Sequence, residues 1–115
     1  MLLLDWNKVF VLHRQLLMNC LNALEGYDVQ LICFGSTVKG TAHNRSDVDI
    51  AYRCKNKEDK NAIRKLVHEH SYDSKHSWLK VDILDIDRVT PNSPLYRNIM
   101  QGMLLKDFSE VKDDV

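Results

Sequence analysis

The sequence lacks the features that mark several large classes of protein. Cysteine is scarce: Cys20, Cys33 and Cys54 are odd in number, widely spaced and without a Cys-x-x-Cys pair, so we expect reduced thiols in the core. An excess of positive charge is also missing, because Lys plus Arg and Asp plus Glu number 16 each. With no overall attraction for phosphate backbones, a polymerase or nuclease is disfavoured, and no stable binding of nucleic acid is expected.

Long apolar runs are absent as well. The apolar start Met1–Leu4 is followed at once by charged and polar residues, which predicts neither a signal peptide nor a membrane span, and we expect a cytoplasmic protein. The chain has no internal repeat, low-complexity tract or linker, and 115 residues suffice for one domain but not two. We assign that domain to residues 1–105 and expect the mixed-charge residues 106–115 to be loosely ordered.

Hydrophobic periodicity predicts helices that alternate with short strands. Apolar residues at three- and four-residue intervals from Asp5 to Leu24 predict a first helix, with Asp5 as its N-cap and Gly26 as its stop. The elements expected after it are a strand over residues 27–34, a helical turn over 36–42, a strand over 47–54, a helix from residue 58 or 59, a strand over 78–86 and a last helix from Pro94 with Ser93 as N-cap.

One stretch, residues 35–50, carries the least common chemistry. Gly35 and Ser36 follow an apolar strand, where glycine allows close approach of a ligand, and the serine hydroxyl and N–H at the start of a short helix favour phosphate. Asp47 and Asp49 begin the next strand one residue apart, so their side chains share a face. Such a pair of like charges needs a positive partner, and hard oxygen ligands suit Mg²⁺. A phosphate-binding turn beside a carboxylate pair predicts nucleotide chemistry.

The same stretch limits how the strands are arranged. The Gly-Ser end of the first strand must lie beside the aspartates at the start of the second, although about a dozen residues separate them, so these strands are expected to be antiparallel. The connection from the second strand to the third contains a full helix and fits a right-handed parallel crossover. We therefore predict an α/β domain of order α-β-α-β-α-β-α, with a small mixed three-stranded sheet covered by helices.

Asp82 is the candidate for a third acid. It lies between Val81 and Ile83 in the middle of a predicted strand, where an unpaired carboxylate is costly, and a shared metal would pair it. Asp85 and Asp87 lie toward the end of that strand and are expected to be solvated or to cap the following segment.

Other polar side chains have less specific interpretations. His13 lies near the apolar stripe of the first helix and is expected to be a boundary or partly buried residue rather than a catalytic one. His43 and Arg45, in the loop after the Gly-Ser turn, could touch a phosphate or be solvated, and we favour solvation because loop charges usually are.

Neither the Gly-Ser turn nor the Asp-x-Asp pair is specific alone, but their combination is. Gly35-Ser36 is followed by ten residues that include Gly40 and end in Ser46, and then by Asp47-Val48-Asp49, with predicted strands on both sides. This pattern resembles the signature of the DNA polymerase beta-like nucleotidyltransferase superfamily. Given the short chain, the sequence is most similar to the minimal nucleotidyltransferases (MNT) that act as antitoxins beside HEPN-domain toxins. The resemblance covers about residues 29–105.

The resemblance implies a nucleotidyltransferase fold, ATP as substrate and two Mg²⁺ ions. The family's nucleotide-binding residues fall on Gly35 and Ser36, and its metal-binding and catalytic acids on Asp47, Asp49 and Asp82. Asp82 would also be the general base. Members often carry a basic residue directly after the Gly-Ser, where this chain has Thr37, and Lys39 could supply that charge with a different reach.

The resemblance further implies a reaction and a partner. AMP would pass from ATP to a tyrosine hydroxyl of a cognate HEPN ribonuclease toxin, and the protein would act as its antitoxin. A chain this small has no room for the further domains with which larger relatives bind their second substrate. Modification of a small molecule such as an aminoglycoside, and non-catalytic binding of the toxin, remain alternatives. Leu104, Leu105 and Phe108 are expected either to lie on a partner or self-association surface or to close the core.

Overall fold

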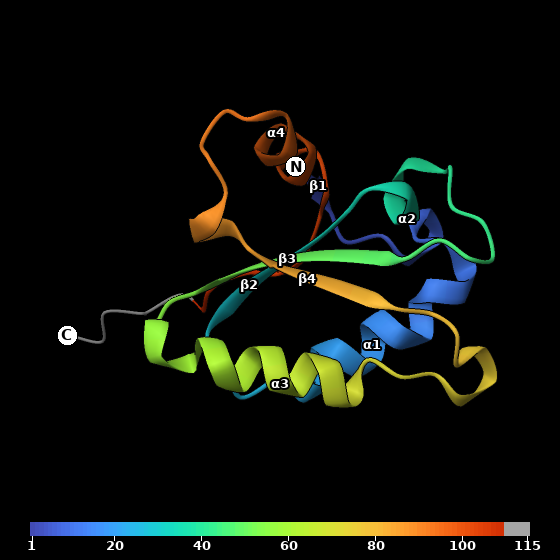
Figure 1. Ribbon diagram of the computed structural model, residues 1–115, viewed down its shortest axis with the longest axis horizontal. Coiled ribbons are helices and arrows are strands. Elements are labelled where there is room, and N and C mark those ends of the chain that lie inside the picture. The colour runs from blue at the N-terminus through green and yellow to red at the C-terminus, as the bar shows by residue number, and fades with distance from the viewer. Residues whose placement is uncertain (110–115) are drawn as a thin grey trace.

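The computed structural model describes residues 1–109, which form one mixed sheet with helices on both faces (Figure 1). The helices are α1 (Arg14–Ala23), α2 (Ser36–Lys39), α3 (Lys60–His70) and α4 (Pro94–Met100). The strands are β1 (Leu2–Leu3), β2 (Val29–Phe34), β3 (Val48–Cys54), β4 (Val81–Asp85) and β5 (Met103–Lys106). Short 3₁₀ turns occur at Trp6–Lys8, Val11–His13, Lys57–Asp59, Ser74–His76 and Ile86–Arg88.

The sheet has the strand order β1-β5-β2-β3-β4. The antiparallel pairing of β2 with β3 and the parallel pairing of β3 with β4 confirm the arrangement predicted from the connections. The predicted extent of three strands is wrong, because β5 pairs antiparallel with β2, and β1 pairs parallel with β5. The predicted order α-β-α-β-α-β-α therefore omits β1 before the first helix and β5 after the last one. β1 has only two residues, too few for a period-two pattern to be recognised in the sequence.

Gly102 lies between α4 and β5. The apolar pattern predicts a last helix that continues through Met103, interrupted near its end by Gly102, and this extent is wrong because α4 ends at Met100 and Met103 begins β5. The N–H of Gly102 donates to the carbonyl oxygen of Ile99 at 2.9 Å, directly after α4. A Cβ at this position would lie 2.6 Å from the carbonyl oxygen of Cys33 in β2, so only glycine allows such a close approach. The start of α4 was predicted correctly, since Ser93 caps it and Pro94 occupies its first turn.

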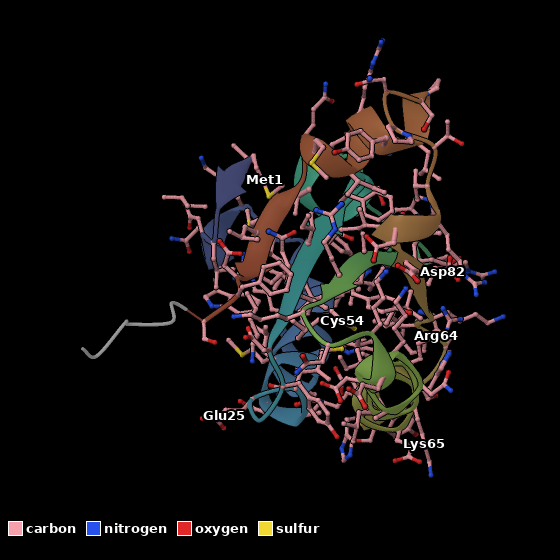
Figure 2. All side chains as sticks on the ribbon, turned by 90° about the vertical axis from the view of Figure 1, so that its left-hand side faces the viewer. Met1, Glu25, Cys54, Arg64, Lys65 and Asp82 are labelled. Atoms are coloured by element: carbon pink, nitrogen blue, oxygen red, sulfur yellow. The ribbon has the colours of Figure 1, made fainter. Side chains whose placement is uncertain are left out.

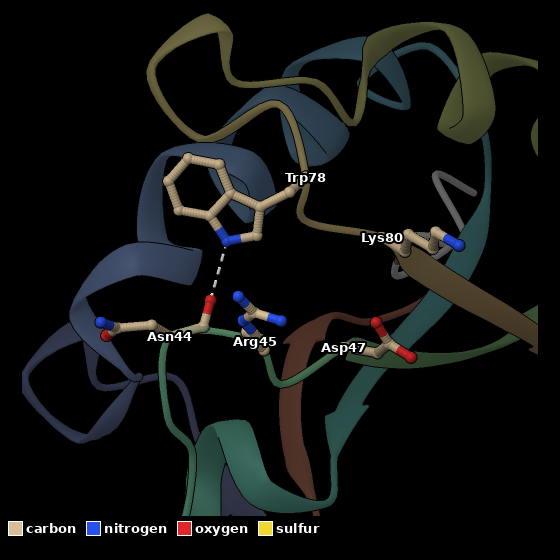
Figure 3. Close-up of a pocket in the computed structure, with 5 residues that line it drawn as sticks. All are labelled: Asn44, Arg45, Asp47, Trp78 and Lys80. Carbon is tan, nitrogen blue, oxygen red and sulfur yellow. Dashed lines mark hydrogen bonds between the residues drawn. The ribbon is translucent and has the colours of Figure 1, made fainter.

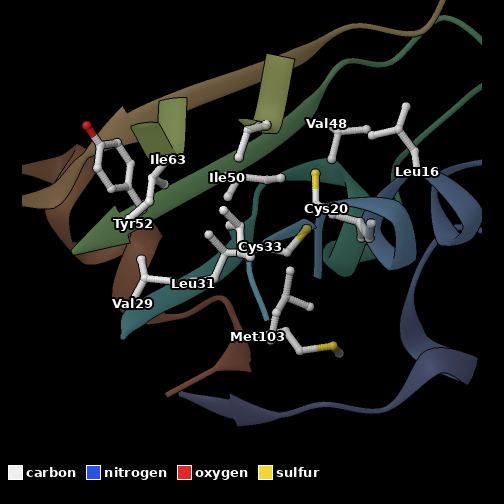
Figure 4. Close-up of a cluster of buried hydrophobic side chains, with 14 of the residues drawn as sticks. Leu16, Cys20, Val29, Leu31, Cys33, Val48, Ile50, Tyr52, Ile63 and Met103 are labelled. Carbon is white, nitrogen blue, oxygen red and sulfur yellow. The ribbon is translucent and has the colours of Figure 1, made fainter. Parts of the chain in front are cut away.

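The two faces of the sheet have separate cores. On one face, which α1 and α3 cover, the buried side chains include Leu16, Cys20, Cys33, Ile50, Tyr52 and Ile63 (Figure 4). On the other face, beside α4, they are Ile32, Phe34, Ala51, Ile86, Val89 and Ile99. Alternation along β3 thus directs Val48 and Ile50 toward α1 and α3, and Asp49 toward the opposite face. All three cysteines are free and buried, as expected.

The first helix begins later than the periodicity predicts. Asp5 caps the turn Trp6–Lys8 by accepting a hydrogen bond from the Asn7 N–H at 3.0 Å, and α1 begins only at Arg14. The intervening chain is held against the sheet end, where the N–H of Phe10 donates to the carbonyl oxygen of Thr37 at 2.9 Å. Tertiary contacts of this kind override local helical periodicity.

The C-terminal apolar residues pack inside the domain. Leu105 is buried, and Leu104 is partly buried against the core on the α4 face, which supports the alternative that these residues close the core. The predicted loose tail lies mainly in residues 110–115, outside the described residues, while Lys106 belongs to β5. Within residues 1–109, every helix is too short or too polar to cross a bilayer.

Candidate active site

Three neighbouring strands bring the predicted site residues into a row. The register pairs Phe34 with Asp49 and Asp49 with Asp82, so Gly35, directly after Phe34, lies next to Asp49 from the other side. Asp47 comes directly before β3. The row crosses the sheet from β2 to β4, and Figure 2 shows Asp82 near the edge of the molecule opposite Met1. The Gly-Ser turn and the three acids, which are separated in the sequence, thus lie next to one another at one site.

Gly35 is adapted to its neighbour in the row. Its backbone has φ 77° and ψ −152°, a conformation that residues other than glycine rarely adopt. A Cβ at Gly35 would lie 2.7 Å from Oδ2 of Asp49, so the missing side chain leaves room for that carboxylate. Ser36 follows as the first residue of α2, which places its hydroxyl and N–H beside the same row.

The carboxylates of the row repel one another. Burial raises the pKa of Asp49 above its usual value, and the charges of Asp82 and Asp47 raise it further. Asp47 and Asp82 are themselves exposed, so a cation can reach them from solvent. Within residues 1–109, no three His, Cys, Asp or Glu side chains stand close enough together to hold a metal as they are, so these acids would have to rotate toward it. Their charge and their hard oxygen atoms fit Mg²⁺.

The structure separates Asp82 from the other acids of its strand. Asp85 faces the opposite side of the sheet, is buried and forms an ion pair of 2.7 Å with Lys60. It also caps the following turn by accepting a hydrogen bond from the N–H of Asp87 at 3.0 Å. The predicted capping is therefore confirmed for Asp85, whereas solvation is wrong for it. No ion pair within residues 1–109 involves Asp82, which leaves it available to a ligand.

Lys39 contacts α4, and no ion pair with the acids of the row is found within residues 1–109. It lies on α2, and its ammonium group donates to the side-chain oxygen of Asn98 on α4. This contact ties α2 to α4 across the site. A role in binding the triphosphate would require Lys39 to exchange that partner for phosphate.

His13 is a site residue that sequence reasoning missed. It is fully buried, not at a boundary, and its ring bridges two segments of the site. Nε2 lies 3.0 Å from the carbonyl oxygen of Ser46, which can only accept, so Nε2 carries the proton. Nδ1 lies 3.0 Å from Oγ1 of Thr37 and accepts its hydroxyl proton. The neutral ring therefore joins α2, which follows Gly35, to the residue directly before Asp47.

Protonation of His13 is expected to weaken the fold at acidic pH. Burial lowers the pKa of His13 below 6.5, against the smaller opposing effects of the Ser46 carbonyl and Asp47. As the pH falls below about 6.5, the unfolded chain takes up a proton before the folded one, so the free energy of unfolding decreases until the lowered pKa is passed. Urea unfolding between about pH 5 and 8 measures this decrease.

The matched variants isolate the contribution of this one histidine. His13→Gln has no titratable group and should show a smaller decrease than the parent. His68→Gln changes an exposed residue of α3 and should keep the parent's pH dependence. Equal pH dependence of the parent and His13→Gln would contradict the assignment of the buried ring.

A pocket adjoins the row of acids at Asp47. Its lining also includes Arg45 from the loop before β3, and Trp78 and Lys80 from the segment before β4 (Figure 3). The predicted strand 78–86 is shorter in the structure, beginning at Val81, so Trp78 stands in a connecting segment rather than on a strand face. No local pattern predicts this pocket, because its residues come from two segments that lie far apart in the sequence.

Comparisons with known proteins identify the family of the chain. A search of curated protein sequences found no match. Among solved structures, one described as the crystal structure of the toxin-antitoxin with AMP-PNP is similar, with a TM-score of 0.58 and 23% sequence identity. The similarity covers 78% of this chain and 72% of that chain, and at this identity it shows the fold alone. Residues 19–110 match the family described as Polymerase beta, Nucleotidyltransferase, a span that includes the Gly-Ser turn and all three acids of the row. The chain belongs to the polymerase beta nucleotidyltransferase family.

Proposed function

We propose that the protein transfers AMP from ATP to a tyrosine hydroxyl of a HEPN-type toxin and acts as its antitoxin. The observation that carries this proposal is the row of Gly35, Asp49 and Asp82 on three adjacent strands, with Asp47 at its end. Support for the toxin partner comes from the similar solved structure, a toxin-antitoxin with AMP-PNP, which is an analogue of ATP.

Each residue of the row has a role in this reaction. Gly35 gives the triphosphate access to the backbone, and Ser36 offers its hydroxyl and N–H to phosphate oxygens. Asp47 and Asp49 would hold Mg²⁺, together with Asp82. When bound, Mg²⁺ would neutralise the triphosphate and polarise the α-phosphate. The carboxylates that repel one another in the free protein are thus the ligands that a divalent cation would stabilise.

The proposed step is a displacement at the α-phosphorus of ATP. The phenolic oxygen of tyrosine forms a bond to that phosphorus, and the bond from phosphorus to the oxygen that bridges to the β-phosphate breaks. Pyrophosphate leaves with the electron pair, and Asp82 takes the phenolic proton. Asp82 suits this role because it is exposed and lies on β4, at the side of the row away from Gly35.

We place the acceptor on another molecule. The 109 described residues are used to build the sheet and its two cores, and they include no second lobe facing the acids. A folded partner that supplies the hydroxyl fits this arrangement better than an aminoglycoside, which larger enzymes enclose with additional domains. Non-catalytic binding of the toxin is disfavoured, because the repulsion of Asp49 by Asp82 and Asp47 would then be present without a cation to bind.

Transfer should be visible with purified proteins. The protein, MgATP labelled in the α-phosphate, and a purified HEPN-type toxin are incubated, and label is expected on a toxin tyrosine. ATP labelled only in the γ-phosphate should leave the toxin unlabelled, because that phosphate departs with pyrophosphate. Label on an aminoglycoside but not on the toxin would keep the enzyme class and contradict the antitoxin proposal.

A further inference from the structure

The pocket beside Asp47 is a concave site that the row of acids does not explain. It has a volume of about 690 Å³, within the usual range for ligand sites, and is lined by Asn44, Arg45, Asp47, Trp78 and Lys80. These residues come from the loop before β3 and from the segment before β4, and Figure 3 shows Arg45 near the ring of Trp78 and Lys80 near Asp47. Since Asp47 belongs to both the pocket and the row, a ligand in the pocket lies beside the reacting centre.

Trp78 is held rigidly although half of it is exposed. Its indole N–H donates to the carbonyl oxygen of Asn44 at 2.9 Å. The ring of His76 meets it edge-on, with centroids 5.3 Å apart, and His76 is itself fixed by a 2.9 Å contact with Asp73. Even so, 53% of Trp78 is accessible to solvent. An indole whose polar group is already satisfied offers its remaining surface for stacking against an aromatic ligand.

Two cationic side chains line the same pocket as this indole. Arg45 and Lys80 are both exposed, and within residues 1–109 neither takes part in an ion pair. The loop that carries Arg45 is ordered by its own hydrogen bonds, including one of 2.9 Å from the His43 N–H to the Ser46 hydroxyl. Asp47 is the one acidic residue among those that line the pocket, and a bound Mg²⁺ would offset its charge. The pocket therefore favours a ligand that carries carboxylates.

The position of the pocket identifies which substrate it would receive. Gly35 and Ser36 lie at the β2 side of the row, while Trp78 and Lys80 lead into β4 at the other side. In an in-line displacement, the attacking oxygen enters opposite the leaving group. If pyrophosphate leaves toward the Gly-Ser turn, the acceptor hydroxyl must enter from the β4 side, where the pocket lies.

We infer that this pocket is the acceptor site, and that it binds a tyrosine-bearing segment of the partner protein with acidic neighbours. The phenol ring packs against Trp78, and the flanking carboxylates pair with Arg45 and Lys80. The inference rests on the proposed function for the identity of the acceptor. Binding to the pocket, however, can be measured without any transfer of AMP.

The test uses two labelled peptides, Asp-Asp-Tyr-Asp-Asp and Lys-Lys-Tyr-Lys-Lys, and fluorescence anisotropy with the full chain in buffer that contains Mg²⁺. We expect the acidic peptide to bind at least about tenfold more tightly than the basic one, and Trp78→Ala to weaken its binding by about tenfold or more. Tyr72→Ala is the matched control, because Tyr72 is 57% exposed but lies outside the pocket. The double variant Arg45→Ala/Lys80→Ala should remove the preference for the acidic peptide. Arg64→Ala/Lys65→Ala, on exposed residues of α3, should keep it.

Adding MgATP distinguishes an acceptor site from a nucleotide site. The acidic peptide should remain bound at saturating MgATP, since the two substrates occupy opposite sides of the row. Displacement of the peptide by MgATP, or unchanged binding in Trp78→Ala, would overturn the inference. If both peptide results hold but the toxin receives no label from ATP, the pocket assignment is supported and the proposed reaction is the part that fails.

Discussion

The double variant Asp47→Asn/Asp49→Asn is expected to lose both MgATP binding and AMP transfer. Asp49 lies in the middle of the row and Asp47 directly before β3, and without their carboxylates the triphosphate charge has no counter-ion held by the protein. Asp82→Asn should behave differently, because Asp82 lies on β4, at the acceptor side. Its ATP affinity should fall modestly, while transfer falls by about 10²–10⁴, the range for a lost general base. Calorimetric titration with MgATP beside a single-turnover transfer assay measures the two effects separately.

Asp85→Asn is the matched control for Asp82→Asn. Asp85 is in the same strand but faces the opposite side and pairs with Lys60, so its substitution should reduce stability and leave the rate of transfer near the parent's. Should Asp82→Asn transfer AMP at the parent rate while Asp85→Asn does not, the third acid is assigned to the wrong residue.

The acids also affect the stability of the fold, which can be measured without any transfer of AMP. The raised pKa of Asp49 means that the folded state holds this proton more readily than the unfolded chain does. Ionisation of Asp49 therefore costs stability as the pH rises through the window above 3.8. Without divalent cation, Asp49→Asn should unfold at higher urea concentration than the parent at neutral pH. Mg²⁺ should stabilise the parent and not the variant.

The sequence predicts the parts of this site that depend on local spacing. The turn at Gly35 and the pair Asp47 and Asp49 could be recognised because each follows or begins a strand with a clear apolar pattern. Asp82 is preferred to Asp85 because it lies between Val81 and Ile83 in the middle of the predicted strand and because the resemblance places the third acid there, and in the structure the two acids face opposite sides of the sheet. Pairing of the central strands followed from the lengths of their connections.

The parts that could not be predicted depend on contacts between distant segments. His13 joins residues 24 and 33 positions further along the chain, and its neighbours in sequence resemble those of any helical boundary residue. Trp78 meets Asn44 across 34 positions. The close approach of Gly102, directly before β5, to β2 is a tertiary contact that no local pattern records. Propensity and periodicity describe single elements, whereas these features arise from how elements meet.

Gly35→Ala is expected to lower AMP transfer by about 10²-fold or more. The backbone at φ 77° and ψ −152° belongs to a region that only glycine adopts readily, so an alanine costs on the order of 1–3 kcal/mol in the folded state. The new Cβ would also meet Oδ2 of Asp49 at 2.7 Å and force that carboxylate out of the row. A displacement of a catalytic group by about 1 Å can cost about 10²-fold in rate. Stability and transfer should therefore both fall.

Gly40→Ala separates the displaced carboxylate from the backbone strain. Gly40 also has a φ of 77°, but nothing lies within 4 Å of the position of its missing Cβ. Its variant should lose about 1–2 kcal/mol of stability from the left-handed backbone alone, while its rate of transfer and its affinity for MgATP stay near the parent's. Urea unfolding measures the stability of both variants, and the single-turnover assay measures their rates of AMP transfer. A similar loss of transfer in the two variants would show that backbone strain, and not the contact between Gly35 and Asp49, controls the rate of transfer. A much larger loss in Gly35→Ala would establish that the glycine is required for the position of the Asp49 carboxylate.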